Sequence, residues 1–277
     1  MSAAALKPAL EAGLRELGLM LSGEQVDRLL AYQDLIAKWN KVYNLTAVRD
    51  PQEMLTHHLL DSLAAIAPLL RQTGGQPGFA AGPPQGETCP LGGQRPAQRR
   101  SVGAGFTAGP PQGETAPSGG GSDPRSGGAW GAHVRLLDVG SGGGLPGVVI
   151  AIACPQIEVH CVDTVLKKAT FIQQVAATLR LPNLRGIHAR VESLKAEEGG
   201  GYDVVCSRAF ASLVDFTTWS RAALKPGAVW MAMKGKHPSD ELSALPAVGV
   251  SVFHVEPLAV PGLGAERCIV WLRPSSV

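Results

Sequence analysis

The sequence predicts an α/β fold of the Rossmann-like type behind an N-terminal helical cap. From residue 134 onward, apolar runs of strand length alternate with helical stretches, and several of these runs are continuously apolar. That pattern is expected of parallel strands that are covered by helices on both faces. The run LLDV at 136–139 then breaks into glycines, which is typical of a strand–turn–helix unit that binds a nucleotide-like ligand.

Composition limits the protein class. The 277 residues are 45% hydrophobic and 17% charged, which indicates a globular chain, and the net charge of +2 leaves only local basic patches for a polyanion. Five cysteines without a CxxC pair predict neither a disulfide framework nor a zinc site, so we expect no metal. Without a signal-peptide pattern or 18 uninterrupted apolar residues, we expect a cytoplasmic protein with no membrane contact.

Residues 1–72 are predicted to be helical. Ser22 and Gln25 have capping-box spacing before a helix over 22–39. A second helix is predicted over 50–70, where Asp50 can cap and Pro51 suits the first helical position.

Residues 73–132 differ in composition from the rest of the chain. They hold 17 of the 34 glycines and 9 of the 21 prolines, and the stretch at 78–93 returns at 105–120 with 13 of 16 positions identical. Two copies that lack an apolar face cannot stack into a core. We therefore predict a flexible, disordered insertion between the helical region and the next domain.

Residues 133–277 form the predicted α/β domain. The last two predicted strands are joined only by a loop, which suggests a hairpin at the end of an otherwise parallel sheet. The predicted strands cover 134–139, 157–163, 184–190, 202–208, 228–235, 250–258 and 266–273, and the predicted helices cover 146–154, 167–180 and 213–223.

The glycine turn admits more than one ligand. Gly142-x-Gly144-x-x-Gly147 formally matches a dinucleotide fingerprint, and Asp163 lies where an acid would meet ribose hydroxyls. Asp138 argues against a pyrophosphate, because a carboxylate two residues before Gly140 would repel it. The same carboxylate can attract the ammonium and sulfonium of S-adenosylmethionine. The residues thus favour a methyl donor and leave open a dinucleotide, or a tight turn without any ligand.

Four blocks of the sequence resemble one protein family. DVGSGGGLPG, WNKVYNLTAVRDPQEML, HLLDS and SRAFASL look like the bacterial ribosomal RNA small subunit methyltransferase G family, known historically as glucose-inhibited division protein B. The resemblance runs from about residue 20 to 72 and from 134 to the C-terminus, and the insertion at 73–132 departs from it. It implies a class I S-adenosylmethionine-dependent methyltransferase that acts on N7 of a guanine in 16S rRNA.

The resemblance also implies site residues for S-adenosyl-L-methionine. Carried over by position, these are Gly140, Leu145, Val191, Glu192 and Arg208. The rule that open α/β sheets bind ligands at the carboxyl ends of their strands adds Asp138, Gly142 and Gly144 near the methionine part and Asp163 at the ribose.

The implied chemistry requires no general base, because guanine N7 is a lone pair without a proton to remove. We therefore predict no acid–base residue, and Arg208 is the best candidate for positioning the reactants. Cys206 is the one candidate nucleophile, and we interpret it as a buried strand residue.

RNA contact is expected from local cations and planar groups in two segments, 38–49 and 234–236, the first of which is predicted to follow a helix. His58 and Asp61 lie one turn apart and could make either an interdomain contact or a substrate contact. The expected partner is 16S rRNA or the small ribosomal subunit, with no stable protein partner and a monomeric chain. The candidate RNA residues are Lys41, Tyr43, Asn44, Arg49, His58, Lys234 and Lys236.

Three other functions remain open from the sequence. A class I methyltransferase could act on a small molecule, but the basic, aromatic segment argues against it. A non-catalytic RNA-binding sensor of S-adenosylmethionine would have the same motifs. An NAD oxidoreductase is disfavoured by Asp138.

Overall fold

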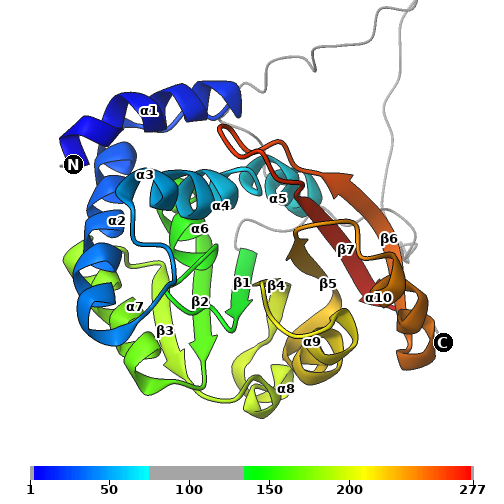
Figure 1. The fold of residues 1–277 in the computed structure, drawn as a ribbon. Coiled ribbons are helices and arrows are strands. Elements are labelled where there is room, and N and C mark those ends of the chain that lie inside the picture. The colour runs from blue at the N-terminus through cyan, green and yellow to red at the C-terminus, as the bar shows by residue number, and fades with distance from the viewer. Residues whose placement is uncertain (1–2, 75–133, 276–277) are drawn as a thin grey trace, which may run out of the picture. The chain divides into compact units, whose positions relative to one another are not determined.

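The structure is a computed structural model that describes residues 3–74 and 134–275, and the statements below concern these ranges (Figure 1). The predicted insertion at 73–132 lies outside them apart from Thr73 and Gly74, so its disorder stays a prediction. The last helix of the N-terminal region ends at that threonine, one residue beyond the predicted boundary, and Gly74 in a left-handed conformation (φ 63°) follows it.

A seven-stranded sheet organises residues 134–275, in the order β3-β2-β1-β4-β5-β7-β6. The first five strands are parallel, and β7 runs antiparallel between β5 and β6, which confirms the predicted terminal hairpin. The strand order reverses between β1 and β4, so the carboxyl ends of these two strands form a topological switch point. The strands are β1 (Val134–Val139), β2 (Ile157–Asp163), β3 (Leu184–His188), β4 (Tyr202–Arg208), β5 (Leu224–Lys234), β6 (Val250–Pro257) and β7 (Cys268–Pro274).

Helices cover both faces of the sheet, as the continuously apolar strands require. Leu136 and Met231 pack in a core shared with the N-terminal helices, α6 (Gly147–Ala153) and α7 (Leu166–Thr178). Leu137 and Trp230 belong to a second core on the opposite face. The elements on or beside that face are α8 (Ala196–Gly199), α9 (Leu213–Ser220) and α10 (Ser239–Ala244).

The N-terminal region begins with α1 (Ala3–Glu16) and α2 (Gly23–Tyr43). The predicted capping box is present, because the Ser22 hydroxyl accepts from the Gln25 amide at 3.2 Å and the Gln25 side chain accepts from the Ser22 amide at 2.9 Å. Gln25 also donates to the carbonyls of Ile152 and Ala153, which ties the start of α2 to the end of α6.

The predicted end of α2 is wrong. The helix continues to Tyr43, and Asn44 caps it in a left-handed conformation with φ 48°. Lys41 and Tyr43 therefore lie in the last turn of α2 and not in a segment after the helix.

The predicted second helix is interrupted. Asp50 caps its start as expected, accepting from the amides of Gln52 and Glu53 at 2.9 and 3.0 Å. A π-helical segment then replaces α-helix at the centre, a feature that recurs at functional sites. The successive pieces are α3 (Pro51–Met54), the π-helix (Leu55–Leu60), α4 (Asp61–Leu63) and α5 (Ile66–Thr73). Within residues 3–74 and 134–275, no helix is long and apolar enough to cross a membrane.

Candidate active site

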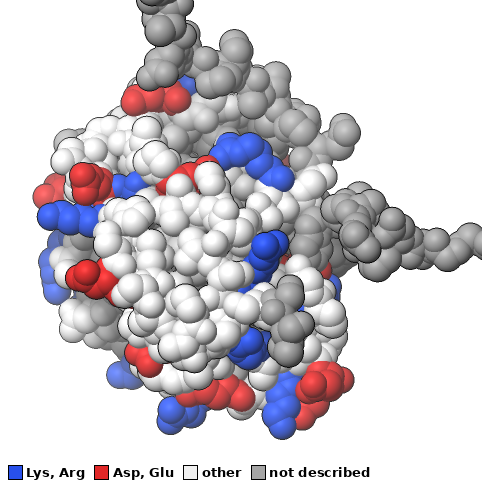
Figure 2. Space-filling view, turned by 90° about the vertical axis from the view of Figure 1, so that its right-hand side faces the viewer, with Lys and Arg blue, Asp and Glu red and all other residues white. Residues whose placement is uncertain are grey.

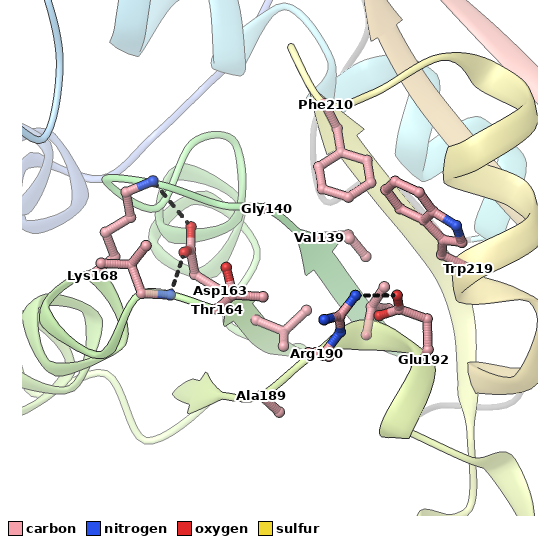
Figure 3. Close-up of a pocket in the computed structure, with 13 residues that line it drawn as sticks. Val139, Gly140, Asp163, Thr164, Lys168, Ala189, Arg190, Glu192, Phe210 and Trp219 are labelled. Carbon is pink, nitrogen blue, oxygen red and sulfur yellow. Dashed lines mark hydrogen bonds and ion pairs between the residues drawn. The ribbon is translucent and has the colours of Figure 1, made fainter.

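Two cavities adjoin at the carboxyl ends of the central strands, and Gly140 lines both of them. The first has a volume of about 340 Å³ and lies between the ends of β1, β2 and β3 and the start of the β4–α9 segment (Figure 3). The second has a volume of about 200 Å³ and lies between the glycine turn, the end of β4 and the N-terminal helices. The predicted residues that line one or both are Gly140, Gly142, Leu145, His58, Asp163, Val191, Glu192 and Arg208.

Asp163 organises the first cavity from the end of β2. One carboxylate oxygen accepts from the Gly142 amide at 3.1 Å and lies 3.5 Å from the Lys168 ammonium, while the other accepts from the Val165 amide at 2.9 Å. The buried carboxylate thus joins the glycine turn to the start of α7. Each oxygen has two lone pairs, so hydroxyl donors of a ligand remain within its capacity.

Aromatic rings and an ion pair form the opposite wall of the first cavity. Phe210 and Trp219 lie edge to face with centroids 5.9 Å apart, and both line the cavity (Figure 3). A Cβ at Gly140 would lie 2.4 Å from the Phe210 ring, which explains why this position is glycine. At the rim, Arg190 pairs with Glu192 at 3.3 Å.

Sequence reasoning missed Lys168, Phe210 and Trp219 as cavity residues. Phe210 carried a signal, since it follows Arg208 within the SRAF block. Lys168 and Trp219 lie on helices whose faces could not be assigned without the packing of the sheet.

Arg208 closes β4 at the second cavity. Its guanidinium donates to the His57 carbonyl and to Asp61, both at 2.8 Å. The second Asp61 oxygen accepts from Arg267, which directly precedes β7, at 2.8 Å. Asp61 is only 2% exposed. One buried carboxylate therefore fixes two guanidinium groups at the switch point, and the broken helix supplies both the carboxylate and the carbonyl.

His58 lines the second cavity and is only 6% exposed. Its Nε2 lies 2.8 Å from the Thr46 hydroxyl. Burial and the nearby Arg208 charge lower the pKa of His58 to about 4, so the ring is neutral at pH 7. Within residues 3–74 and 134–275, neither His58 Nδ1 nor the buried Ser141 hydroxyl has a hydrogen-bond partner.

Asp138 and Gly144 are not among the residues that line the two cavities. Asp138 is fully buried and accepts from the Gly147 amide at 2.9 Å, and burial raises the pKa of its carboxyl to about 7. A Cβ at Gly144 would meet Val148 at 2.4 Å, and the hydroxyl of Tyr32 donates to the Gly143 carbonyl at 2.6 Å. These contacts give both predicted residues a role in shaping the turn.

Cys206 is fully buried on β4, and burial raises the pKa of its thiol well above the usual value. This agrees with its interpretation as a strand residue. Across the described ranges, no group of three His, Cys, Asp or Glu side chains could hold a metal ion.

The predicted RNA residues divide into exposed and internal ones. Tyr43 is exposed beside Trp39 at 5.0 Å, and the Lys167 ammonium lies 5.3 Å from its ring centroid. Lys234 is instead paired with Glu241 at 2.9 Å, and this ion pair connects the end of β5 to α10. His58 is also internal, as described above. The remaining candidates, all exposed, are Lys41, Asn44, Arg49 and Lys236.

This sheet order, with a glycine turn after β1 and an acid at the end of β2, defines a class I S-adenosylmethionine-dependent methyltransferase. Comparison with known proteins then gives the family. The model of the family described as rRNA small subunit methyltransferase G matches residues 25–74 and 130–270. The chain belongs to this family of rRNA methyltransferases.

Curated relatives agree with this assignment. The proteins named ribosomal RNA small subunit methyltransferase G from Acidovorax ebreus and Polaromonas naphthalenivorans are 55% and 54% identical to the chain. The alignments cover 99% and 98% of this chain and 98% and 97% of the relatives, respectively. The family model leaves 75–129 unmatched, whereas these two relatives align over nearly the whole chain.

Proposed function

We propose that this chain transfers a methyl group from S-adenosylmethionine to N7 of a guanine in 16S rRNA. The observation that carries the proposal is the pair of cavities that meet at Gly140, one lined by Asp163, Phe210 and Trp219, the other by the glycine turn and Arg208. Their position at the switch point of the sheet is where an extended ligand binds in open α/β folds.

The residues present fit the methyl donor. Asp163 would accept from ribose hydroxyls, and the segment at 190–192 would frame the adenine beside Phe210. Asp138 holds the turn through the Gly147 amide, and Gly144 is one of the residues of the turn. The donor-binding set is then Gly140, Gly142, Leu145, Asp163, Val191, Glu192 and Arg208.

The chain's contribution to the reaction is positioning. When bound, S-adenosylmethionine supplies a methyl group on an electrophilic sulfonium. Arg208 is held in place by Asp61 and the His57 carbonyl, so it is preorganised at the end of β4. No residue needs to take a proton from guanine N7, which agrees with the high thiol pKa of Cys206 and with Asp61 being paired with two guanidinium groups.

Small groups of side chains near the cavities would contact the RNA. The Lys167 ammonium lies 5.3 Å from the centroid of the Tyr43 ring, and Lys167 precedes Lys168, which lines the first cavity. An RNA strand could stack on the ring and pair with the ammonium beside this cavity. On the face shown in Figure 2, Lys and Arg side chains occur in separate small groups with Asp and Glu among them. This distribution favours local contacts over a continuous basic surface. The proposed RNA residues are Lys41, Tyr43, Asn44, Arg49 and Lys236, together with Lys167.

We further propose that the protein acts as a cytoplasmic monomer on the small ribosomal subunit or its precursor. One chain supplies residues to both cavities, so a second copy is not needed to complete the site. Light scattering in solution should give the mass of one 28.9 kDa chain, and a dimer mass would contradict this part of the proposal.

The test is methyl transfer from radiolabelled S-adenosylmethionine to 30S particles or free rRNA from a strain that lacks the gene. Arg208→Ala should lower the rate by at least tenfold, because the variant loses the group that closes β4 at the second cavity. The matched control is Arg15→Ala, which removes an exposed arginine on α1 and should leave the rate unchanged. Normal turnover by Arg208→Ala would remove this residue from the site.

A further inference from the structure

A third cavity, with a volume of about 380 Å³, lies at the same edge of the sheet as the candidate active site. The residues that line it lie after β5, near the end of β6 and around the start of β7. β5 runs parallel to β4, and β7 is antiparallel to both β5 and β6. The end of β5, the end of β6 and the start of β7 therefore meet at the edge where β1 and β4 end. None of the residues that line this cavity lines the first two.

Arg267 joins the third cavity to the candidate active site. Its Nε donates to one oxygen of Asp61 at 2.8 Å, and the other oxygen accepts from Arg208, which lines the second cavity. A single carboxylate thus separates the guanidinium groups of the two cavities. A polymer that places one of its units at the second cavity would therefore carry a nearby unit to the third.

The lining of the third cavity combines apolar surface with a cationic donor. Within residues 3–74 and 134–275, the Arg267 side chain donates from Nε to Asp61 and from Nη1 to the Glu266 carbonyl. A guanidinium has five N–H donors, so those of Nη2 remain for a ligand. A planar group with an apolar face and a polar edge fits such a lining. The apolar side chains that line the cavity are Val255, Pro257, Leu258 and Cys268.

The charges at this cavity favour a neutral ligand group over an anion. The exposed Glu266 lines the cavity, and Arg267 already shares the charge of Asp61 with Arg208. A phosphate inside would lie close to the Glu266 carboxylate and be repelled by it. A nucleobase is neutral, and its edge carries acceptors that match Arg267 and N–H donors that match Glu266.

We propose that the third cavity binds an unstacked base of the substrate RNA, close in the RNA chain to the guanine that is methylated. The proposal rests on the proposed function, which makes the substrate an RNA. Proteins that recognise single-stranded RNA bind splayed-out bases between apolar side chains and guanidinium planes. Arg267 contacts the base, and the exposed Lys236, which lies between two residues of the lining, meets the adjoining phosphate. The RNA is then held at two points, the target guanine and this base.

Gly235 allows the third cavity to be blocked without crowding the fold. It lines the cavity and is exposed, and the nearest atom to a Cβ at this position would be Arg267 Nη1 at 4.0 Å. Gly235→Trp therefore adds a side chain that occupies the cavity. The matched control is Gly199→Trp at the end of α8, an exposed position where a Cβ would meet nothing within 4 Å. Thermal melting reports whether each variant is folded, and Gly235→Leu replaces Gly235→Trp if the larger side chain prevents folding.

The test compares RNA affinities by fluorescence anisotropy. Once the methylated guanine has been located by labelling, 16S rRNA is ligated around a synthetic segment in which each flanking nucleotide is made abasic in turn. With wild type, one flanking position should lower the affinity about tenfold when it is abasic, since the contacts of one base are lost. Gly235→Trp should bind the unmodified RNA about tenfold more weakly and lose no further affinity at that position. Titration calorimetry without RNA should give wild type, Gly235→Trp and Gly199→Trp the same affinity for S-adenosylmethionine.

Three results would overturn the proposal. Gly235→Trp could bind RNA as tightly as Gly199→Trp, or it could lose further affinity at every abasic position, and in either case no base occupies the cavity. A loss of methylation with 30S particles but not with free rRNA would assign the cavity to a ribosomal protein. If wild type methylates no rRNA, the proposed function itself fails, which is a distinct result.

Discussion

At the scale of single residues, the carboxyl of Asp138 is buried beneath the glycine turn with one oxygen unpartnered among the described residues. Burial raises its pKa from 3.8 to about 7. The folded state therefore binds more protons than the unfolded state between about pH 4 and 7. Stability from this residue is present at low pH and is lost as pH rises through 7.

Asp138→Asn should remove this pH dependence. An asparagine oxygen can still accept from the Gly147 amide, and no charge forms beneath the turn. The free energy of unfolding of wild type should fall from pH 5 to pH 8, whereas that of the variant should not. The difference in unfolding free energy between variant and wild type should therefore grow by roughly a few kcal/mol over this range. Urea unfolding at the two pH values measures this difference. The exposed Asp240→Asn serves as control, and an Asp138→Asn difference that does not change with pH would contradict the ionisation argument.

Local motifs made part of the site predictable. The glycine turn and Asp163 follow one strand each, so their place at the carboxyl edge could be inferred from the sequence alone. The environment of His58 could not, because it depends on how Thr46, the broken helix and β4 pack together. The same holds for Lys234, whose partner Glu241 lies on a short polar helix with little sequence signal.

At the scale of elements, Gln25 connects the helical region to the α/β domain. It completes the capping box of α2 and donates to two carbonyls at the end of α6. Gln25→Ala should lower the free energy of unfolding by about 1–3 kcal/mol, since cap and bridging bonds are lost together. Chemical denaturation measures this, with exposed Gln52→Ala as the matched change. Equal losses in the two variants would show that the bridge contributes nothing.

The element boundaries show where sequence periodicity stops being informative. The strands were predictable because short apolar runs alternate with longer helical stretches, as in a sheet that helices cover on both faces. The π-helical segment was not, since the apolar spacing over 50–70 fits a continuous α-helix equally well. The position of β7 between β5 and β6 likewise depends on tertiary pairing that no local pattern encodes.

At the scale of the whole molecule, the helical region and the sheet build the site together. The helical region supplies Thr46, His58 and Asp61, and the sheet supplies the glycine turn and Arg208. The second cavity therefore exists only when both parts are packed. The helical region that contributes to this cavity also carries Lys41 and Tyr43, the proposed RNA contacts. The proposed sites for the methyl donor and for the RNA therefore share this region.

The proposed activity of this site is methylation of a guanine at N7 in 16S rRNA. The most direct measurement is mass spectrometry of nucleosides and fragments from small-subunit rRNA of a strain lacking the gene, after incubation with the protein and isotopically labelled S-adenosylmethionine. Label is expected in 7-methylguanosine at one position of 16S rRNA, present with wild type and strongly reduced with Arg208→Ala. Label on another base, on another guanine atom or in no nucleoside would contradict methylation of guanine N7 by this site.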